Sequence, residues 1–444
     1  MRVILKNFRV VDEETDIRGV VIVEDGIITG VHGEEPPSCA KAHGTGEAAL
    51  VIDGSGLSSS DKLPVLMPAF VDLHAHFRDP GVPSESPLPS EVLESASLAA
   101  AAGGFGTVVC MANTAPAIDT LEKAKTLKSR CDSLGLVDLY PVLSLSKRLE
   151  GKELSEIVGL FPESASYIPL MLSEDGRDLA DDGLFLAAMK EARRLGIPVS
   201  CHCDLGGDEA GAVRRVIDLG KRAGCRIHIA HVSTREAVEA IARTKKEVQA
   251  VEGGFALTCE ATPHHLCLVK DDAVKLGEKT WGRVNPQLRP EEDRQALIRA
   301  IVDGTLDAIA TDHAPHSRAD KEAGAPGFSG LETAFAAVFT ELSHPVIEPK
   351  VGAGRGGHID LKSLSSLMSA RPAGFLGFGD SQKRGRMLPG HRADLVVVDT
   401  EASWVVAPGA FKSRGKNSPL AGRKLNGKIL LTLQKGKVVF SAVP

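Results

Sequence analysis

The sequence lacks the features that mark several large classes of protein. Its 444 residues carry a formal net charge of −6, so no basic excess is available for nucleic acid or an anionic membrane surface. No apolar run approaches the roughly 20 residues needed to cross a bilayer. Polar and charged side chains appear too early in residues 1–12 for a signal peptide. We therefore expect a cytoplasmic protein that binds neither nucleic acid nor membrane.

The eight cysteines lack the spacing of a disulfide framework or of a zinc-binding motif. They are scattered, and several lie in apolar runs, where cysteines are usually buried and reduced. Cys201 and Cys203 flank His202 and form a Cys/His cluster. On a strand, however, alternation points both cysteines to the face opposite His202. We therefore expect these thiols to be structural.

The chain has β-rich ends around a different middle. Hydrophobic residues make up 43% and charged residues 25%, which is ordinary for a globular protein. Short β-rich runs separated by turns occupy residues 2–32 and return at 393–399 and 428–440. We expect them to form a small β-sandwich domain built from both chain ends, residues 1–67 and 386–444. Two unrelated flaps are the alternative.

Residues 68–385 alternate short apolar runs with helical patterns. Eight runs have the nearly continuous apolar character of buried parallel strands: 69–74, 106–111, 138–143, 168–172, 197–202, 226–231, 255–260 and 306–311. Helical patterns lie between many of them, for example 91–102, 121–134, 184–195, 209–223, 235–244 and 291–302. This α/β pattern predicts a (β/α)8 TIM barrel. A doubly wound open sheet is the alternative fold.

Two histidines end the first predicted strand. His74 and His76 are one residue apart, so they project from the same face of that strand. Two imidazoles on one face make half a metal site, although an isolated pair of this kind often faces solvent. In a barrel, functional side chains gather at the carboxyl ends of the strands. Residue types that bind metal follow four further strands: Asp175, His202, His231 and Asp312.

Four histidines and two carboxylates suit Zn²⁺ or a similar divalent ion, one or two per chain. Such an ion lowers the pKa of a bound water into the neutral range and also polarises a carbonyl group. The chemistry that needs both effects is hydrolysis of an amide-like bond. Asp312 is the candidate to accept the water proton and return it to the leaving nitrogen.

The motifs around these residues resemble those of the dihydroorotases, in the type I, bacterial long-chain class of the amidohydrolase superfamily. Residues 70–81, Phe-Val-Asp-Leu-His-Ala-His-Phe-Arg-Asp-Pro-Gly, are similar to the first signature of that family. Residues 311–316, Thr-Asp-His-Ala-Pro-His, are similar to the last. Further segments follow the order of the family and extend the resemblance over nearly the whole chain: 111–116, 261–266, 284–289, 326–332, 388–395 and 412–422.

The resemblance implies a role for each candidate residue. The four histidines would bind metal, and Asp312 would be both a ligand and the general acid–base group. Asp175 would bridge two ions, because the strand before it has no lysine for that place; Glu174 is the rival. The substrate would be bound by a set of rim residues: Arg78, Asn113, Asn285, His316, Pro326 and Gly327.

Arg78 points to a substrate. A planar guanidinium binds a carboxylate through two hydrogen bonds, which suits dihydroorotate or N-carbamoyl-L-aspartate. Allantoinases resemble the motif but do not carry the arginine. The resemblance thus implies zinc-dependent, reversible cyclisation of N-carbamoyl-L-aspartate to dihydroorotate, the third step of pyrimidine biosynthesis.

Two other readings stay open. One is another cyclic-ureide amidohydrolase, similar to allantoinase or hydantoinase. The other is a non-catalytic partner of aspartate carbamoyltransferase, although such proteins lack metal ligands and this chain has the full set. An active enzyme can also join that transferase, and we expect a homo-oligomer.

The remaining histidines have structural interpretations. His264 and His265 are adjacent, so at most one faces inward, and we expect a structural or supporting role. His228 lies on the other face of its strand from the candidate ligand and should pack under a helix. His313 follows the candidate acid–base residue and should point away from it.

Two segments beside the predicted site are less defined by their sequence. Residues 82–90 replace a more charged segment of the family pattern, so the geometry of that loop is open. Residues 317–329 contain glycines and a proline and are a candidate lid.

Overall fold

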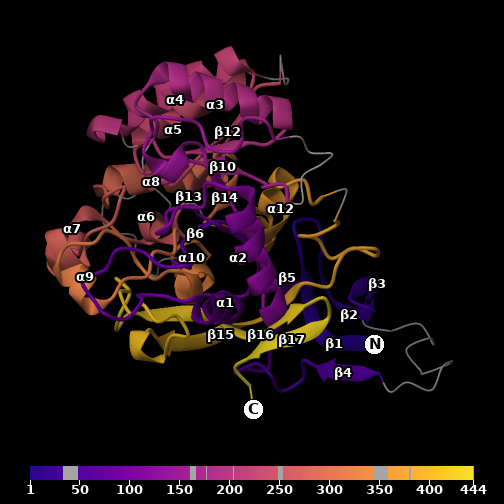
Figure 1. Ribbon diagram of the computed structural model, residues 1–444. Coiled ribbons are helices and arrows are strands. Elements are labelled where there is room, and N and C mark those ends of the chain that lie inside the picture. Colours follow the sequence, from indigo (N-terminus) through magenta and orange to yellow (C-terminus); the bar gives the residue numbers. More distant parts are fainter. Residues whose placement is uncertain are drawn as a thin grey trace.

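The structure, a computed structural model, describes residues 1–33, 49–160, 167–176, 178–203, 205–248, 254–343, 359–379 and 382–443. In Figure 1 a barrel of strands and helices stands above a β layer that contains both termini. Among the described residues, no helix combines the length and the apolar character that a membrane span requires. Cys39 lies outside the described residues, and the other seven cysteines form no disulfide; all but Cys267 are buried.

The barrel is a closed ring of parallel strands. One part runs β6 (Phe70–Ala75), β7 (Phe105–Cys110), β8 (Asp138–Pro141). The other runs β9 (Leu143–Ser144), β10 (Leu172–Ser173), β11 (Val199–Cys201), β12 (Arg226–Ile229), β13 (Ala256–Ala261), β14 (Ala308–Ile309). The ring closes beyond β14, where Asp312 N donates to His74 O at 2.9 Å and His76 N donates to His313 O at 2.8 Å. The predicted (β/α)8 fold is confirmed, and the open sheet is wrong.

Each of the eight predicted strands overlaps a strand of this ring, with β8 and β9 sharing the run 138–143. The largest displacement is at 168–172, where β10 begins only at Leu172. Pro169 has no backbone N–H to contribute to a ladder, so the apolar run before Leu172 does not extend the strand.

Helices cover the outside of the ring. The long ones are α1 (Leu93–Ala102), α2 (Leu121–Leu134), α3 (Asp182–Leu195), α4 (Glu209–Ala223), α5 (Arg235–Glu247), α8 (Glu291–Val302) and α10 (Ala334–Leu342). Short helices are α6 (Pro263–Cys267), α7 (Lys270–Leu276), α9 (Arg318–Glu322), α11 (Leu361–Ser365) and α12 (Arg371–Phe375). Helices α2 to α5 each begin after a Thr or Asp side chain that accepts a backbone N–H. Helices α2, α3 and α4 end at a glycine with positive φ, which stops them cleanly.

The chain ends join in one sheet of paired strands. Its order is β17 (Lys437–Ser441), β16 (Lys424–Gln434), β15 (Leu395–Val405), β5 (Val65–Pro68), β1 (Arg2–Val11), β2 (Asp16–Glu24), β3 (Ile27–His32), with β4 (Leu50–Asp53) beside β1. Strand β5 pairs with both β1 and β15, so it links the N-terminal strands to the C-terminal ones. Apolar side chains from both ends of the chain form a core separate from that of the barrel. A β domain built from both ends is therefore confirmed; its boundaries, 1–67 and 386–444 around 68–385, remain our proposal.

Candidate active site

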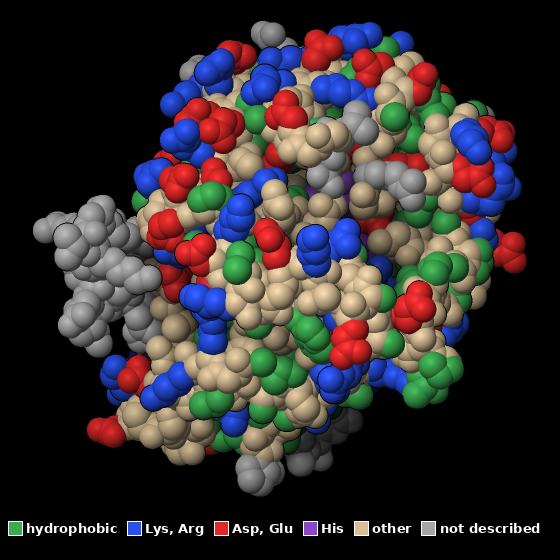
Figure 2. All heavy atoms as spheres, turned by 90° about the vertical axis from the view of Figure 1, so that its left-hand side faces the viewer, with side chains coloured by type: hydrophobic (Ala, Val, Ile, Leu, Met, Phe, Trp, Pro, Cys, Tyr) green, Lys and Arg blue, Asp and Glu red, His purple; other side chains and the backbone are tan. Residues whose placement is uncertain are grey.

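All twelve residues that the sequence singles out line one cavity of about 340 Å³ at the carboxyl ends of the barrel strands. Figure 2 shows this face hollowed, with histidine side chains visible inside. The six candidate ligands and Arg78 are each less than 9% exposed, while Asn285 lies at the exposed mouth. The structure thus brings together every residue predicted for the site, and the role of each stays a proposal.

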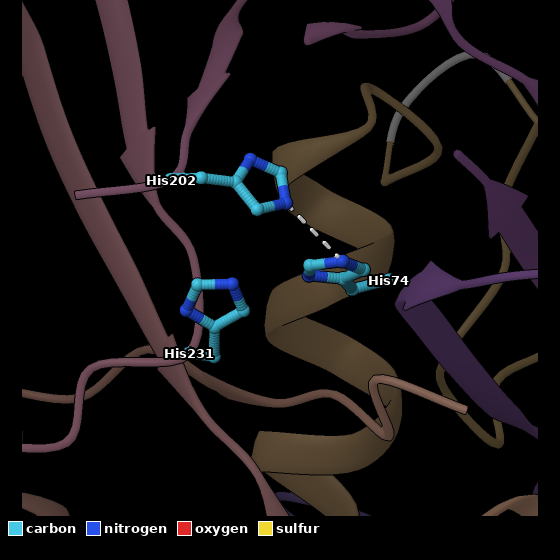
Figure 3. Close-up of side chains that lie close together, drawn as sticks. All are labelled: His74, His202 and His231. Carbon is cyan, nitrogen blue, oxygen red and sulfur yellow. Dashed lines mark hydrogen bonds between the residues drawn. The ribbon is translucent and has the colours of Figure 1, made fainter. Parts of the chain in front are cut away.

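Three histidines from three strands meet at the base of the cavity. His74 lies in β6, His202 directly follows β11, and His231 follows β12 by two residues; Figure 3 shows their rings facing one another. Their nearest potential ligand nitrogens all lie within 4.8 Å, and the Nε2 atoms of His74 and His202 are 3.4 Å apart. Buried nitrogens that converge in this way suit a metal cation.

A second group of potential ligands shares one of these histidines. The ligand atoms of His74, His76 and Asp312 also lie within 4.8 Å of one another. Asp312 Oδ1 is 3.1 Å from His76 Nε2 and 3.6 Å from His74 Nε2. The two groups share His74, so they adjoin one another.

Asp175 lies between the two groups. Its Oδ1 is 3.1 Å from His202 Nε2, and its Oδ2 is 3.8 Å from His76 Nδ1. Both oxygens are buried, and within the described part of the chain neither has a hydrogen bond of acceptable geometry. A buried carboxylate without such partners is costly unless a cation compensates it, so Asp175 fits a metal ligand. The rival, Glu174, instead accepts hydrogen bonds from the backbone N–H and hydroxyl of Ser146.

The charges of the cluster attract a cation. Burial alone would lower the pKa of His74, but the hydrogen bond that its Nδ1–H donates to Glu260 and the charge of Asp312 raise it to about 9. Burial would raise the pKa of Asp175 and of Asp312, yet the surrounding histidines hold both below the usual range. Burial lowers the pKa of His231, which keeps its imidazole in the neutral form that binds metal.

Backbone strain concentrates in the same place. Arg78, Asp175, His231 and Asp312 have φ values of 54°, 37°, 33° and 45°, in the left-handed region that favours glycine. Each such residue costs roughly 1–3 kcal/mol, so the surrounding fold must hold it there. Strain of this kind is typical of functional sites.

Glu260 is a site residue that the sequence analysis missed. It lies in β13, and its Oε1 is 3.1 Å from His74 Nδ1 while its Oε2 is 3.0 Å from His228 Nε2. A carboxylate on Nδ1 fixes the tautomer of His74 and directs the lone pair of Nε2 into the cavity. The signal was present, because Glu260 ends the predicted strand 255–260. His228 packs against Phe375 of α12, as expected, with ring centroids 4.8 Å apart.

Arg78 lies at the rim of the cavity, beside the candidate metal ligands. Its Nη1 donates to Asn113 Oδ1 at 3.3 Å, and His76 Nδ1 lies 2.9 Å from the same oxygen. Its Nη2 is 3.4 Å from His316 Nε2, which is also 2.9 Å from Pro326 O. Since a carbonyl only accepts, His316 Nε2 carries its hydrogen toward Pro326 and cannot accept from Arg78.

The guanidinium of Arg78 therefore keeps one edge for a ligand. Among the described residues, its Nε has no hydrogen-bond partner. Nε and Nη2 lie on the same edge of the group, and this edge matches the two oxygens of a carboxylate. Asn113 and His316 lie on either side of it, so these three rim residues converge on one position.

The other histidines behave largely as predicted. His265 Nδ1 is 2.7 Å from Thr262 Oγ1, and its Nε2 donates to Pro286 O at 3.0 Å, so it supports the loop that carries Asn285. His264 is buried with its ring against Phe328. His313 accepts a hydrogen bond from Gly330 N and points away from the cavity.

The loop 82–90, which the sequence left open, reaches the cavity through Val82 and Pro83. Asp320 in α9 fixes it by accepting hydrogen bonds from the hydroxyl of Ser84 and the backbone N–H of Glu85. The loop therefore borders the rim and is held in place by the segment 317–329. That segment as a lid stays a prediction.

A closed barrel with a buried His/Asp cluster that could hold a metal ion indicates an amidohydrolase. Residues 65–439 match the Amidohydrolase family. Dihydroorotases of Clostridium botulinum (33% identity) and Caldanaerobacter subterraneus subsp. tengcongensis (34%) align with 99% of the chain and with 100% and 97% of their own lengths. The chain therefore belongs to the amidohydrolase family and, within it, to the dihydroorotases.

Solved structures support the same fold. The L-hydantoinase (dihydropyrimidinase) of Arthrobacter aurescens has a TM-score of 0.79 at 24% identity, and covers 100% of this chain and 96% of its own. The dihydropyrimidinase of Brevibacillus agri NCHU1002 has a TM-score of 0.78 at 21% identity, with coverage of 99% and 95%. At these identities the likeness concerns the fold alone.

Proposed function

We propose that the protein interconverts N-carbamoyl-L-aspartate and dihydroorotate, with zinc as its metal. The observation that carries this proposal is the unpartnered Nε–Nη2 edge of Arg78, buried beside the metal-binding cluster. Dihydroorotate has a ring carboxylate that fits this edge, whereas a simple hydantoin or allantoin lacks one. The names of the relatives at 33–34% identity agree with this substrate.

The side chains of the cavity would have three roles: holding the metal, orienting the substrate and transferring the proton. The four histidines, Asp175 and Asp312 would hold one or two zinc ions, which when bound supply a water activated at neutral pH and polarise the ring amide carbonyl. Arg78, Asn113 and His316 orient the substrate carboxylate, and Asn285, Pro326 and Gly327 border the ring. In hydrolysis Asp312 accepts the water proton and passes it to the leaving ring nitrogen; in cyclisation the proton moves in the opposite direction.

The proposal extends to the assembly of the protein. We expect a cytoplasmic homo-oligomer, and association with aspartate carbamoyltransferase is a separate question that the same experiment answers. Light scattering of the purified protein, alone and mixed with the transferase, measures both properties. A monomer whose mass does not change on mixing would contradict this part of the proposal.

The decisive experiment measures turnover and zinc on the same sample. We expect dihydroorotate hydrolysis and N-carbamoyl-L-aspartate cyclisation, with one or two zinc ions per chain. Hydantoin and allantoin are the matched controls, and we expect them to be turned over at least 100-fold more slowly. Faster turnover of either control would instead assign another cyclic ureide, and no turnover with no zinc would indicate a non-catalytic partner.

A further inference from the structure

We infer that Asn417 and Lys321 are positioning residues for substrate binding, and that the C-terminal segment 412–422 is a working part of the substrate site. The inference rests on the proposed function, since it concerns the rim that would hold the substrate carboxylate. Neither side chain lines the cavity, and both act on the backbone that does.

The backbone at Gly327 forms a wall of the cavity. Its φ of 132° favours glycine, and a Cβ there would lie 2.5 Å from Ala314 Cβ. The chain can therefore pass only as glycine at this point. The position of this peptide relative to His316 sets the shape of the carboxylate subsite.

Lys321 holds this wall from below. Its side chain is fully buried, and Nζ donates to the backbone oxygens of Arg283 at 2.9 Å, Ala325 at 2.8 Å and Gly327 at 3.0 Å. Burial lowers the pKa of Lys321 to about 7, but three carbonyl acceptors require all three hydrogens of the ammonium form. Within the described residues Lys321 forms no ion pair, so the backbone carbonyls of the rim are what compensates its charge.

Asn417 holds the same wall from the far end of the chain. Its Nδ2 donates to Ala314 O and to Gly327 O, both at 3.0 Å. Its Oδ1 accepts from His316 N at 3.0 Å and from Ser329 Oγ at 2.8 Å. The amide thus uses all of its hydrogen-bonding capacity, and it is only 2% exposed.

The segment that carries Asn417 is itself docked on the barrel. Glu332 accepts the backbone N–H groups of Lys412 and Ser413, at 2.9 and 3.0 Å. Glu91, at the start of α1, accepts the hydroxyl of Ser413 and the backbone N–H of Arg414. The position of Asn417 is therefore fixed by contacts with Glu91 and Glu332 in addition to its contacts with the rim.

The two side chains converge on a single peptide group. The Gly327 carbonyl accepts from both Lys321 and Asn417, and the Gly327 N–H donates to Arg283 O at 3.0 Å. Arg283 O also accepts from Lys321, and Asn285 follows two residues later. These contacts set the spacing between the Asn285 loop and the 316–327 rim, so their loss should weaken substrate binding more than the chemical step.

The test compares Asn417→Asp and Lys321→Met with the wild type, all loaded with zinc. Asn417→Asp keeps the shape but turns a carboxylate oxygen toward two carbonyls, and Lys321→Met keeps the length without donors. We expect KM for dihydroorotate to rise at least 10-fold, kcat to fall less than about 3-fold, and zinc content to stay unchanged. Backbone hydrogen–deuterium exchange over residues 312–329 should be faster in both variants.

Matched controls are Lys279→Met, at an exposed lysine, and Asn7→Asp, where the new charge faces Asp53 in the β domain. Both should keep the wild-type KM and the wild-type exchange of 312–329. Should either test variant fail to fold, Asn417→Ser and Lys321→Arg replace them, and the same KM increase is expected.

Wild-type KM and wild-type exchange in both variants would overturn the inference. Equal loss of kcat, zinc and thermal stability would overturn it too, because that pattern indicates a structural role only. Failure of the proposed function is distinguishable: the wild type would not turn over dihydroorotate, while faster exchange of 312–329 in the variants would still show the clamp on the rim.

Discussion

The half of the cavity lined by the six candidate metal ligands and the rim proposed to bind the substrate are built in different ways. The candidate ligands stand at or just beyond the ends of barrel strands, and backbone hydrogen bonds such as Asp312 N to His74 O set their spacing. Their support comes from inside the barrel, where Glu260 lies behind His74. The fold alone therefore places the metal-binding half.

The rim depends on loops and on contacts between distant parts of the chain. Arg78 and Asn113 lie three residues beyond the ends of β6 and β7, and His316 lies seven beyond β14. Asn285 lies 24 residues beyond β13, after α6 and α7. Asp320 of α9 holds the loop after Arg78, His265 holds the loop that carries Asn285, and Asn417 holds the backbone at His316. On the proposed function, the barrel would supply the chemistry common to the family, and the loops would determine the choice of substrate.

The largest effect should come from Asp312, which we propose to be both a metal ligand and the acid–base group. Asp312→Asn keeps an oxygen ligand but cannot carry a proton, so we expect kcat to fall by about 10³-fold or more with zinc still bound. Steady-state kinetics and metal analysis on the same sample measure both quantities. Asp132→Asn, at an exposed carboxylate on α2, is the control and should be fully active. A variant of Asp312 that turns over normally would remove its acid–base role.

The next prediction tests the support of the metal-binding half. Glu260→Gln keeps the shape but removes the charge behind His74, so we expect zinc affinity to fall about 10–100-fold, measured by competition with a chelator. Glu174→Gln is the matched control, since that buried carboxylate bonds Ser146 outside the cavity. Loss of zinc in the control but not in Glu260→Gln would reverse our assignment of these two residues.

Substitution of Arg78 in the rim should change KM, whereas substitution of Asp312 changes kcat. Arg78→Met removes a two-pronged, charge-assisted contact worth about 1.5–3 kcal/mol, so KM for dihydroorotate should rise about 10–100-fold without loss of zinc. Arg78→Lys keeps the charge but not the fork, and we expect an intermediate KM. An unchanged KM in both variants would point to a substrate without a carboxylate.

The contrast between the two halves also explains what the sequence could predict. Apolar runs of strand length located the barrel, and the residues that follow them include all six candidate ligands. The rim residues came only from the family resemblance, because loops have no periodicity from which side-chain direction can be inferred. Glu260 ends the seventh predicted strand, 255–260, so its position at the end of a strand was a signal in the sequence.

The remaining supports lie beyond any local pattern. Asn417 contacts His316, which lies 101 residues earlier in the chain. Lys321 is buried and bonds backbone carbonyls, but its local sequence does not distinguish it from a solvent-exposed lysine. Strand β10 was displaced because the apolar run before it contains a proline. Contacts between distant segments depend on the completed fold, so the sequence alone could not locate them.

The smallest expected effect concerns His265, which holds the Asn285 loop in the rim. Burial lowers the pKa of His265 from 6.5 to about 4, against the opposing hydrogen bond to Pro286 O. Between these two pH values His265 is protonated in the unfolded chain and neutral in the folded chain. The free energy of unfolding must therefore fall as the pH decreases from 6.5 toward 4, by at most about 3 kcal/mol from this group.

Urea-induced unfolding at pH 7 and pH 5 measures this dependence in the wild type and in His265→Asn side by side. The variant loses two hydrogen bonds and should be less stable at pH 7, but its stability should change less between the two pH values, by about 2 kcal/mol. The other titrating groups, including the metal ligands, are the same in both proteins and cancel in the comparison. An identical pH dependence would mean that the folded protein does not hold His265 neutral. The support of the Asn285 loop would then tolerate a charge.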